Sequence, residues 1–247
     1  SIMGEYANIM AEDEEIEEQN TVEAILKERD YVNYEDETGT TRTCVVLYGP
    51  ENANYSSYGI QIITMETVED IEIGNGTGNV EENNLTYFEI ARNSYNNAIS
   101  TLNTRAQAYL NTTYASEARS VGSVPNNPTY DGAGMYTGED SWFADYNETL
   151  KDEDENYLTD WNQMDTLGIQ SIDKDYWLAS RYVNHDVNLF YVRISGRMAN
   201  GRICRVTNNI PNSYSFTNGL RVVFTLKSGI KVTGGNGEET SPYTLGT

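Results

Sequence analysis

Residues that commonly carry catalytic or metal chemistry are scarce in this chain of 247 residues. It contains one histidine, His185, and two cysteines, Cys44 and Cys204, which lie far apart in the sequence. A single histidine cannot form a multi-histidine metal site within the chain, and no nucleophile–base pair can be assigned from the sequence. The two cysteines are compatible with a disulfide or with two buried thiols. We therefore expect no catalytic residues, and a protein that is not an enzyme.

Side chains suited to recognition are concentrated between Ala179 and Leu220 instead. This segment contains five arginines and a single acid, Asp186, in a chain whose formal net charge is −22. Guanidinium groups donate paired hydrogen bonds to carboxylates, whereas tyrosine supplies rigid contact area and asparagine supplies adaptable hydrogen bonds. The local excess of arginine favours a ligand with carboxylate or other anionic groups.

Two patterns of apolar spacing predict the elements that would position these residues. From Phe88 to Leu110 apolar residues are three and four positions apart, which predicts a helix that packs on a sheet. Short β-branched or alternating runs predict strands, and we expect those near Val46, Ile62, Val192 and Val223 to share one sheet. The predicted strands are Arg42–Tyr48, Gly59–Met65, Leu189–Ile194, Arg202–Val206 and Leu220–Leu226.

The two ends of the chain complete the expected organisation. Tyr6–Arg29 is acidic and contains no Pro or Gly, which predicts one or two helices, and Ile230–Leu245 predicts a small terminal hairpin or tail. We expect an N-terminal helical segment at residues 1–33 and one ligand-binding domain at residues 34–247. The expected fold class is α+β, with short antiparallel strands, one or two packed helices and long loops, preceded by the acidic helix.

Charge and hydropathy exclude several kinds of partner. A net charge of −22 repels phosphate backbones and anionic lipid, so we expect no nucleic-acid binding and no direct membrane binding by this segment. The sequence contains no apolar run of about 18 residues, and no signal-peptide pattern. The acidic loops between Asn111 and Asp165 lack the spacing of an EF-hand. We expect no cofactor, with calcium left open and exposed acidic loops as the alternative.

Three motifs occur in order in the last third of the chain. They are YWLAS at Tyr176–Ser180, FxVR at Phe190–Arg193 and NGLRxVFTL at Asn218–Leu226. This order resembles the variable proteins of diversity-generating retroelements. The resemblance implies a C-type lectin-like fold, similar in architecture to the formylglycine-generating enzymes. One departure is Val222, which stands where many relatives carry Pro.

The resemblance also implies that codons between the motifs are rewritten by copying a template with errors at adenines. Rewriting the first two positions of an Asn codon cannot produce Glu, Gln, Lys, Trp or Met. Between Ala179 and Leu220 the chain has no Glu, Gln, Lys or Trp, and Met198 is the only residue of a forbidden type. The alternative is that a strand-and-loop region uses few Glu and Lys residues, because β-propensity disfavours them.

The expected function is therefore ligand binding or adhesion without catalysis, by a retroelement-diversified variable face on a C-type lectin-like scaffold. The partner would be a protein or glycan on a cell or phage surface, and the expected location is extracellular, on a cell surface or a virion. Alternation sends Phe190 and Val192 inward, and Ile194 shares their parity. The residues expected to bind the ligand are Asn184, His185, Asp186, Asn188, Leu189, Tyr191, Ile194, Arg197, Met198, Asn200, Arg202, Ile203 and Arg205.

Two other functions remain as alternatives. One is a structural subunit, pilin-like or from a phage tail fibre, for which oligomerisation through the N-terminal helix is left open. The other, less favoured, is an oxidase of the formylglycine-generating type, which would require Cys44 and Cys204 to meet at a copper site.

Overall fold

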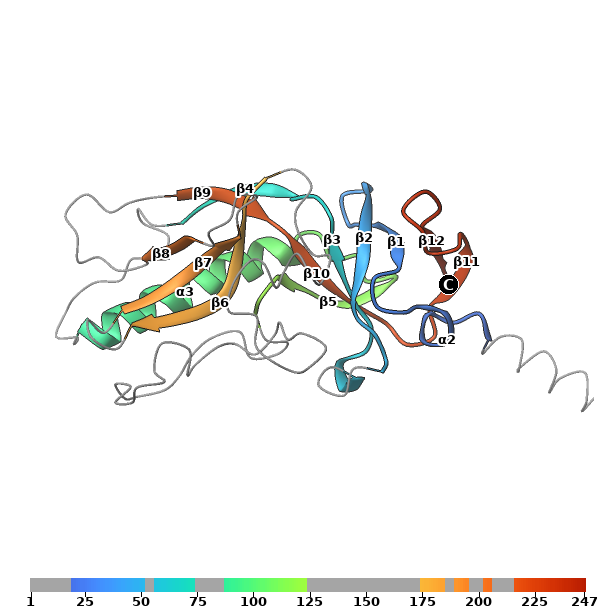
Figure 1. Cartoon of the computed structure of the whole chain (residues 1–247), viewed down its shortest axis with the longest axis horizontal. Coiled ribbons are helices and arrows are strands. Elements are labelled where there is room, and N and C mark those ends of the chain that lie inside the picture. The colour runs from blue at the N-terminus through green and yellow to red at the C-terminus, as the bar shows by residue number, and fades with distance from the viewer. Residues whose placement is uncertain are drawn as a thin grey trace, which may run out of the picture. The chain divides into compact units, whose positions relative to one another are not determined.

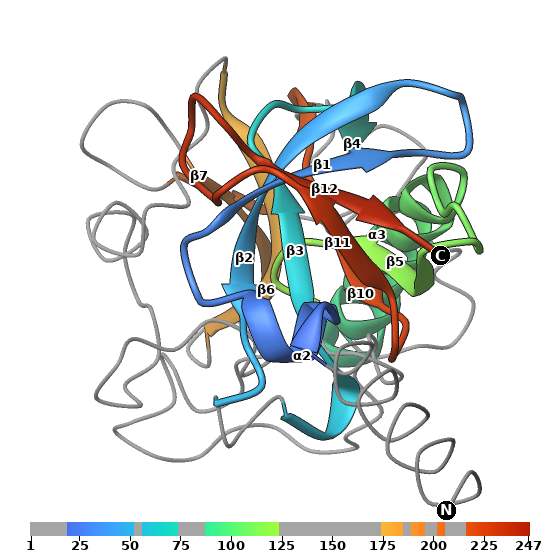
Figure 2. The same cartoon turned by 90° about the vertical axis from the view of Figure 1, so that its right-hand side faces the viewer.

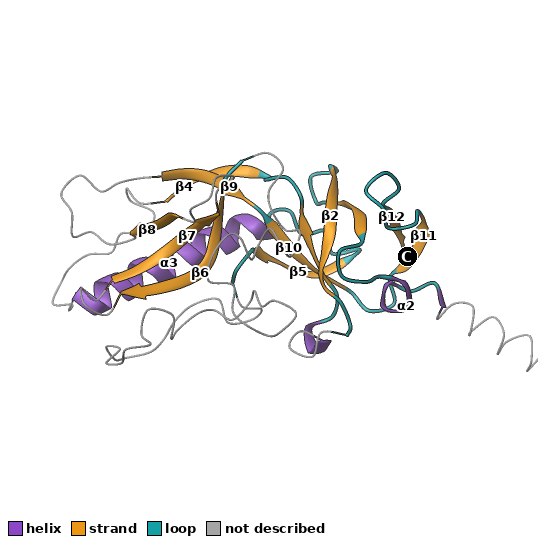
Figure 3. Ribbon diagram, viewed as in Figure 1, coloured by secondary structure: helices purple, strands orange, loops and turns teal. Residues whose placement is uncertain are grey.

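The computed structural model describes residues 19–51, 56–73, 87–123, 174–184, 189–195, 202–205 and 216–247. These residues form mostly strands in two sheets with few helices, which confirms the predicted α+β class (Figure 1 and Figure 3). None of the described helices is long and apolar enough to cross a membrane. The elements are α2 (Val22–Ile25), β1 (Tyr31–Glu35), β2 (Thr41–Tyr48), the 3-10 helix η1 (Ser56–Tyr58), β3 (Gln61–Thr64), β4 (Glu69–Ile73), α3 (Tyr87–Gln107), β5 (Ala115–Ser120), β6 (Tyr176–Asn184), β7 (Leu189–Ser195), β8 (Arg202–Arg205), β9 (Phe216–Leu220), β10 (Val222–Leu226), β11 (Lys231–Gly234) and β12 (Tyr243–Gly246).

The strands are divided between a seven-stranded sheet, in the order β11-β12-β1-β2-β3-β10-β5, and a five-stranded sheet, in the order β4-β9-β6-β7-β8. The strands at Val46, Ile62 and Val223 belong to the first sheet, and the strand at Val192 belongs to the second. The expectation of one sheet is therefore wrong. Alternation identifies a segment as a strand, but it carries no information about which strands pair.

The chain is organised as two compact units. The first comprises Ser1–Ile63, Leu110–Glu117 and Phe224–Thr247, and the second comprises Thr64–Tyr109 and Ala118–Val223. The division therefore falls within β3, β5 and β10.

In the first unit, β1 and β2 form an antiparallel hairpin, and β12 pairs with β1 in parallel. Figure 2 shows β1, β11 and β12 in this unit. The β11 and β12 strands pair with each other in antiparallel fashion, so the predicted terminal hairpin is present. The predicted acidic helix, Tyr6–Arg29, lies outside the described residues up to residue 18, and α2 is a single turn.

In the second unit, α3 packs on β6 and β7 (Figure 1). This is the helix predicted from the apolar spacing, and its buried residues follow that spacing: Ala98, Ile99, Leu102 and Ala106. The helix ends at Gln107, earlier than the apolar pattern suggests. The next two N–H groups, of Ala108 and Tyr109, bond to carbonyls three residues back, which tightens the last turn and ends the helix.

Candidate binding face of the five-stranded sheet

The structure describes the predicted ligand-binding residues that lie in strands. Asn184 ends β6, while Leu189, Tyr191 and Ile194 lie in β7 and Arg202, Ile203 and Arg205 lie in β8. The others lie outside the described residues: His185, Asp186, Asn188, Arg197, Met198 and Asn200. For the residues in β7 and β8 the backbone register gives the position and the face of the sheet.

The face that packs against α3 is identified at β4. The side chains of Ile71 and Ile73 are buried, whereas Asp70 and Glu72 between them are exposed. Glu69 has the same parity as the two isoleucines, and its Oε1 accepts a hydrogen bond from Nε of Arg105 in α3 at 3.0 Å. This hydrogen bond and the charge of Glu69 raise the pKa of the Arg105 guanidinium. Glu69, Ile71 and Ile73 therefore lie on the α3 side of the sheet.

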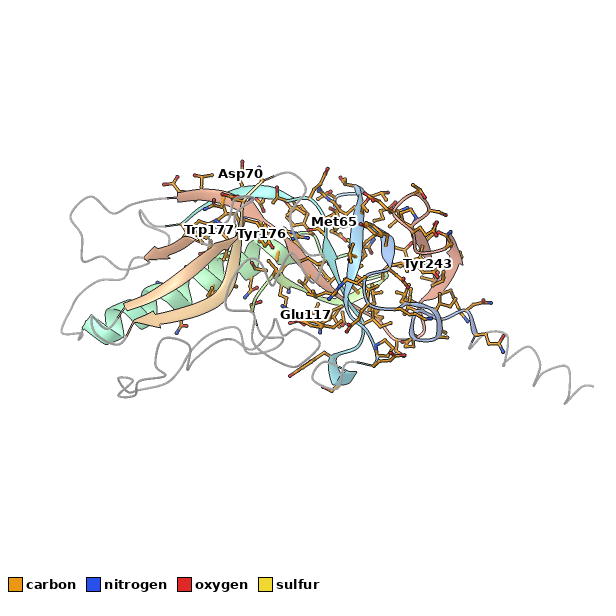
Figure 4. All side chains as sticks on the ribbon, viewed as in Figure 1. Met65, Asp70, Glu117, Tyr176, Trp177 and Tyr243 are labelled. Atoms are coloured by element: carbon orange, nitrogen blue, oxygen red, sulfur yellow. The ribbon has the colours of Figure 1, made fainter. Side chains whose placement is uncertain are left out.

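The pairing of β4 with β9, and of β9 with β6, extends this face assignment to β6. Asp70 pairs with Gly219 in β9, and Gly219 pairs with Tyr176 in β6, so these three residues share the face opposite α3. Trp177, the next residue, lies on the α3 side, where its Nε1 donates to the carbonyl oxygen of Ile71 at 2.8 Å. The Trp177 side chain is fully buried. Figure 4 labels Asp70, Tyr176 and Trp177 at this sheet.

A bulge in β6 shifts the pairing of this strand with β7, but the residues of β6 on either side of it still alternate between the same two faces of the sheet. Leu178 pairs with Arg193 and Arg181 pairs with Val192, so Ala179 and Ser180 have no partner in β7. The insertion leaves the N–H of Ala179 available, and it donates to the carbonyl of Val121 at 2.9 Å. Because two residues are inserted, the side chains on both sides of the bulge keep the same parity.

Beyond the bulge the register divides β7 and β8 between the two faces. Trp177 pairs with Ile194, and Ile194 pairs with Arg202, so both Ile194 and Arg202 lie on the α3 side together with Phe190 and Val192. The opposite face is named the outer face here, and it includes the exposed residues Asp70, Glu72 and Thr217. Its members in β6, β7 and β8 are Tyr182, Asn184, Leu189, Tyr191, Arg193, Ile203 and Arg205.

The structure thus brings five of the predicted binding residues together on one face, namely Asn184, Leu189, Tyr191, Ile203 and Arg205. It does not bring Ile194 and Arg202 to that face. Two outer-face residues, Tyr182 and Arg193, were absent from the prediction. Arg193 could have been predicted from the sequence, because it lies two residues from Tyr191 in the same strand and therefore on the same face. Tyr182 could not, because its face follows only from the pairing of β6 with β7.

Residues of the first and third sequence motifs form a structural cluster in the second unit. Arg221 is fully buried, its Nε donates to the carbonyl of Thr64 at 2.7 Å, and its guanidinium carbon lies 4.7 Å from the centre of the Tyr176 ring. Thr64 Oγ1 in turn accepts from the N–H of Val222 at 3.2 Å. A β-carbon on Gly219 would lie 2.2 Å from Cγ2 of Thr67, so this position requires glycine. These residues support the sheet and are not available to a ligand.

The structure was searched for metal-binding groups among the residues that it describes. Among those residues, no group of three or more His, Cys, Asp or Glu side chains is placed to hold a metal ion. Cys44 is buried in β2 of the seven-stranded sheet, and Cys204 lies in β8 of the five-stranded sheet.

Comparison with known proteins gave no match for this chain, neither to a protein-family model nor to a curated protein or a solved structure.

Proposed function

We propose that this protein binds a ligand without catalysis, and that the outer face of its five-stranded sheet is a variable binding surface on a C-type lectin-like scaffold. In this proposal the chain is the variable protein of a diversity-generating retroelement, displayed outside the cell or on a virion. Its partner is a protein or glycan on a cell or phage surface.

The observation that carries the proposal is the division of residues between the two faces of the sheet. The α3 side holds Trp177, whose indole is buried and hydrogen bonded. On the outer face, the backbone register pairs Tyr191 with Arg205 and Arg193 with Ile203. A scaffold can accept many side chains on an exposed face, where substitutions usually change stability by less than about 0.5 kcal/mol. Substitutions of large buried residues cost about 3–5 kcal/mol. Diversification limited to one face therefore preserves the fold.

The positive charge of the proposed binding face supports a role in ligand recognition. Arg193 and Arg205 share the outer face, in a chain with a net charge of −22. Arginine and tyrosine are the side chains that most often dominate binding surfaces, because they combine large contact area with directed hydrogen bonds.

The test is an exchange of the outer face alone. Asn184, Leu189, Tyr191, Ile203 and Arg205 are replaced by the residues at the same positions of a differently diversified relative whose ligand is known. Binding is measured by surface plasmon resonance, and folding by near-ultraviolet circular dichroism. We expect the exchanged protein to fold and to bind the ligand of the donor protein.

A matched control is Thr217→Ser, which changes an exposed residue of the same face in β9, outside the exchanged set. This variant should keep the original binding. A folded exchange protein that fails to acquire the donor's ligand would show that the binding site lies elsewhere.

A further inference from the structure

Two side chains of α3 bind the backbone of β5, the strand that follows β10 at one end of the seven-stranded sheet. Asn103 Oδ1 accepts a hydrogen bond from the N–H of Ser120 at 2.8 Å. Gln107 Nε2 donates a hydrogen bond to the carbonyl oxygen of Ala118 at 2.5 Å. The two amides of α3 therefore lie where a further strand would pair with β5.

The bonded backbone groups of β5 point away from β10. The N–H of Val121, the residue after Ser120, donates to the carbonyl oxygen of Arg221 at 3.2 Å, next to the first residue of β10. Neighbouring residues of a strand direct their N–H and C=O groups to opposite sides, so those of Ser120 and Ala118 face the side away from β10. The carbonyl of Ser120 is also occupied, because Ser123 Oγ donates to it at 2.8 Å.

The spacing of the two amides matches the repeat of the strand. Asn103 and Gln107 are four residues apart, so they share one face of the helix and lie about 6 Å apart along its axis. Ala118 and Ser120 are two residues apart, about 6.6 Å along β5. Because the N–H of Ser120 can only donate, the amide of Asn103 must turn its oxygen toward the strand.

This edge of β5 lies at the surface of the protein. The side chain of Gln107 is exposed, and so is that of Ser116, two residues before Ala118 in β5. A strand edge with unpaired N–H and C=O groups near solvent is a template for pairing with another chain. Ala118 and Ser120 would present such groups if Gln107 and Asn103 did not bind them.

The strand at the opposite end of the sheet, β11, is covered by main chain. The N–H of Val232 donates to the carbonyl of Asn20 at 2.7 Å, and the N–H of Val22 donates to the carbonyl of Ile230 at 2.8 Å. The cover at β5 differs, because the partners in α3 are side chains. Substitution can therefore remove the cover of β5 without changing the path of the backbone.

We propose that Asn103 and Gln107 form an edge guard, which prevents β5 from pairing with β5 of a second copy of this chain. An antiparallel pair of identical strands has two-fold symmetry, so a second copy offers each released N–H and C=O group the complementary group of the same strand. The guard satisfies these groups within one chain, and its removal leaves self-pairing as the alternative to hydration.

The experiment removes the guard and measures self-association. Asn103→Ala and Gln107→Ala are combined in the full 247-residue chain, and sedimentation velocity is compared with the parent from about 1 to 100 μM. At the highest concentration the average mass of the folded variant should rise toward about 2-fold that of the parent. The amides of Ala118 and Ser120 should then exchange with deuterium at least about 10-fold more slowly than at the lowest concentration.

Arg105→Ala is the matched control, because it removes the hydrogen bond from the same helix end to Glu69 and leaves both amides in place. Its average mass should follow that of the parent. A folded double variant that also follows the parent would overturn the proposal, as would association without protection of β5. If the double variant does not fold by circular dichroism, Gln107→Ala alone is measured in the same way, and unchanged mass and exchange would overturn the proposal.

Discussion

The indole N–H of Trp177 in β6 donates to the carbonyl oxygen of Ile71 in β4 at 2.8 Å. The two strands are not neighbours, because β9 lies between them in the sheet. The bond therefore ties the start of β6 across β9 to the edge strand, on the side where α3 packs. It also confirms that Trp177 lies on the α3 side of the sheet.

Replacing Trp177 should destabilise the fold in two measurable steps. Trp177→Phe keeps an aromatic ring and removes the donor to Ile71, which should cost about 1–3 kcal/mol because a buried carbonyl loses its partner. Trp177→Ala also leaves a large cavity and should cost about 3–5 kcal/mol. Urea denaturation midpoints measure both, with the exposed Thr217→Ser as the control, expected within about 0.5 kcal/mol. Equal costs for all three variants would contradict the assignment of the buried face.

The elements with strong periodicity could be predicted from the sequence. The run near Val46 became β2, the run near Val192 became β7, and the helix begins within one residue of Phe88. In each case the local apolar spacing matches the burial that the fold imposes, so propensity and tertiary structure agree.

Other elements could not be predicted because their residues carry a weak local signal. The strand β4 reads Glu-Asp-Ile-Glu-Ile, and β5 is Ala-Ser-Glu-Ala-Arg-Ser, neither of which is rich in strand formers. They are strands because neighbours pair with them, which is a tertiary effect. The parallel pairing of β12 with β1 joins two strands that lie far apart in the sequence, and no local pattern reports such a contact.

The candidate site was predictable in part for the same reason. Alternation within β7 gives the parity of Tyr191 and Ile194, so it separates these two residues. Assigning Arg202 and Arg205 to opposite faces requires the pairing of β8 with β7, which the sequence does not contain. A cluster of arginines is visible in a sequence, whereas the face on which each one lies is a property of the sheet.

Tyr34 should make stability depend on alkaline pH. Its ring stacks on Phe224 with centres 4.0 Å apart, and its hydroxyl accepts a hydrogen bond from the N–H of Asn111 at 2.9 Å. Burial raises the pKa of Tyr34 far above its usual value. The neutral phenol therefore stabilises the fold fully below the unfolded pKa of about 10, and this contribution is lost as the pH rises above it.

Tyr34→Phe keeps the stack on Phe224 and removes the ionisable group. The variant should be less stable than the parent at pH 7 by about 0.5–1.5 kcal/mol, because the hydroxyl's hydrogen bonds with the backbone of Asn111 are lost. Above a pH of about 10 the difference should shrink, since only the parent must hold this tyrosine neutral. Urea unfolding at pH 7, 9 and 11 measures it, and a constant difference would contradict the role of this hydroxyl.

Asp36 should make the stability of the fold depend on pH in the acidic range. Its Oδ1 accepts from the N–H of Thr38 at 2.9 Å and its Oδ2 accepts from Nε of Arg42 at 2.7 Å, within the β1–β2 turn. Burial alone would raise the pKa of this carboxyl, but the hydrogen bonds from Thr38, Arg42 and Thr40 outweigh it and hold the pKa below its usual value. The stabilisation is therefore present above a pH of about 3.9 and is lost as the pH falls through the lower, folded pKa.

Asp36→Asn should test this directly. The amide keeps the shape of the side chain and loses the charge, so the variant should be about 1–3 kcal/mol less stable at pH 7. The gap between parent and variant should narrow below a pH of about 3.9. Thermal unfolding from pH 7 to pH 2.5 checks it, with Glu72→Gln in β4 as the control for removing an exposed charge. A gap that widens with acid would reverse the assigned sign.

The last prediction concerns the gene, and it follows from the two faces of the sheet. If the chain is diversified at adenines of a template, the codons for the outer-face residues Asn184, Tyr191 and Arg205 should correspond to Asn codons in a nearby template repeat. The codon for Trp177 should be identical in gene and template, because the only Trp codon, TGG, contains no adenine. Met198 should also match, because rewriting an Asn codon at its first two positions cannot produce Met. Sequencing of the locus checks this, together with a search for an adjacent reverse transcriptase. Mismatches at bases other than adenine, or spread evenly over codons of both faces, would show that this segment was not diversified in this way.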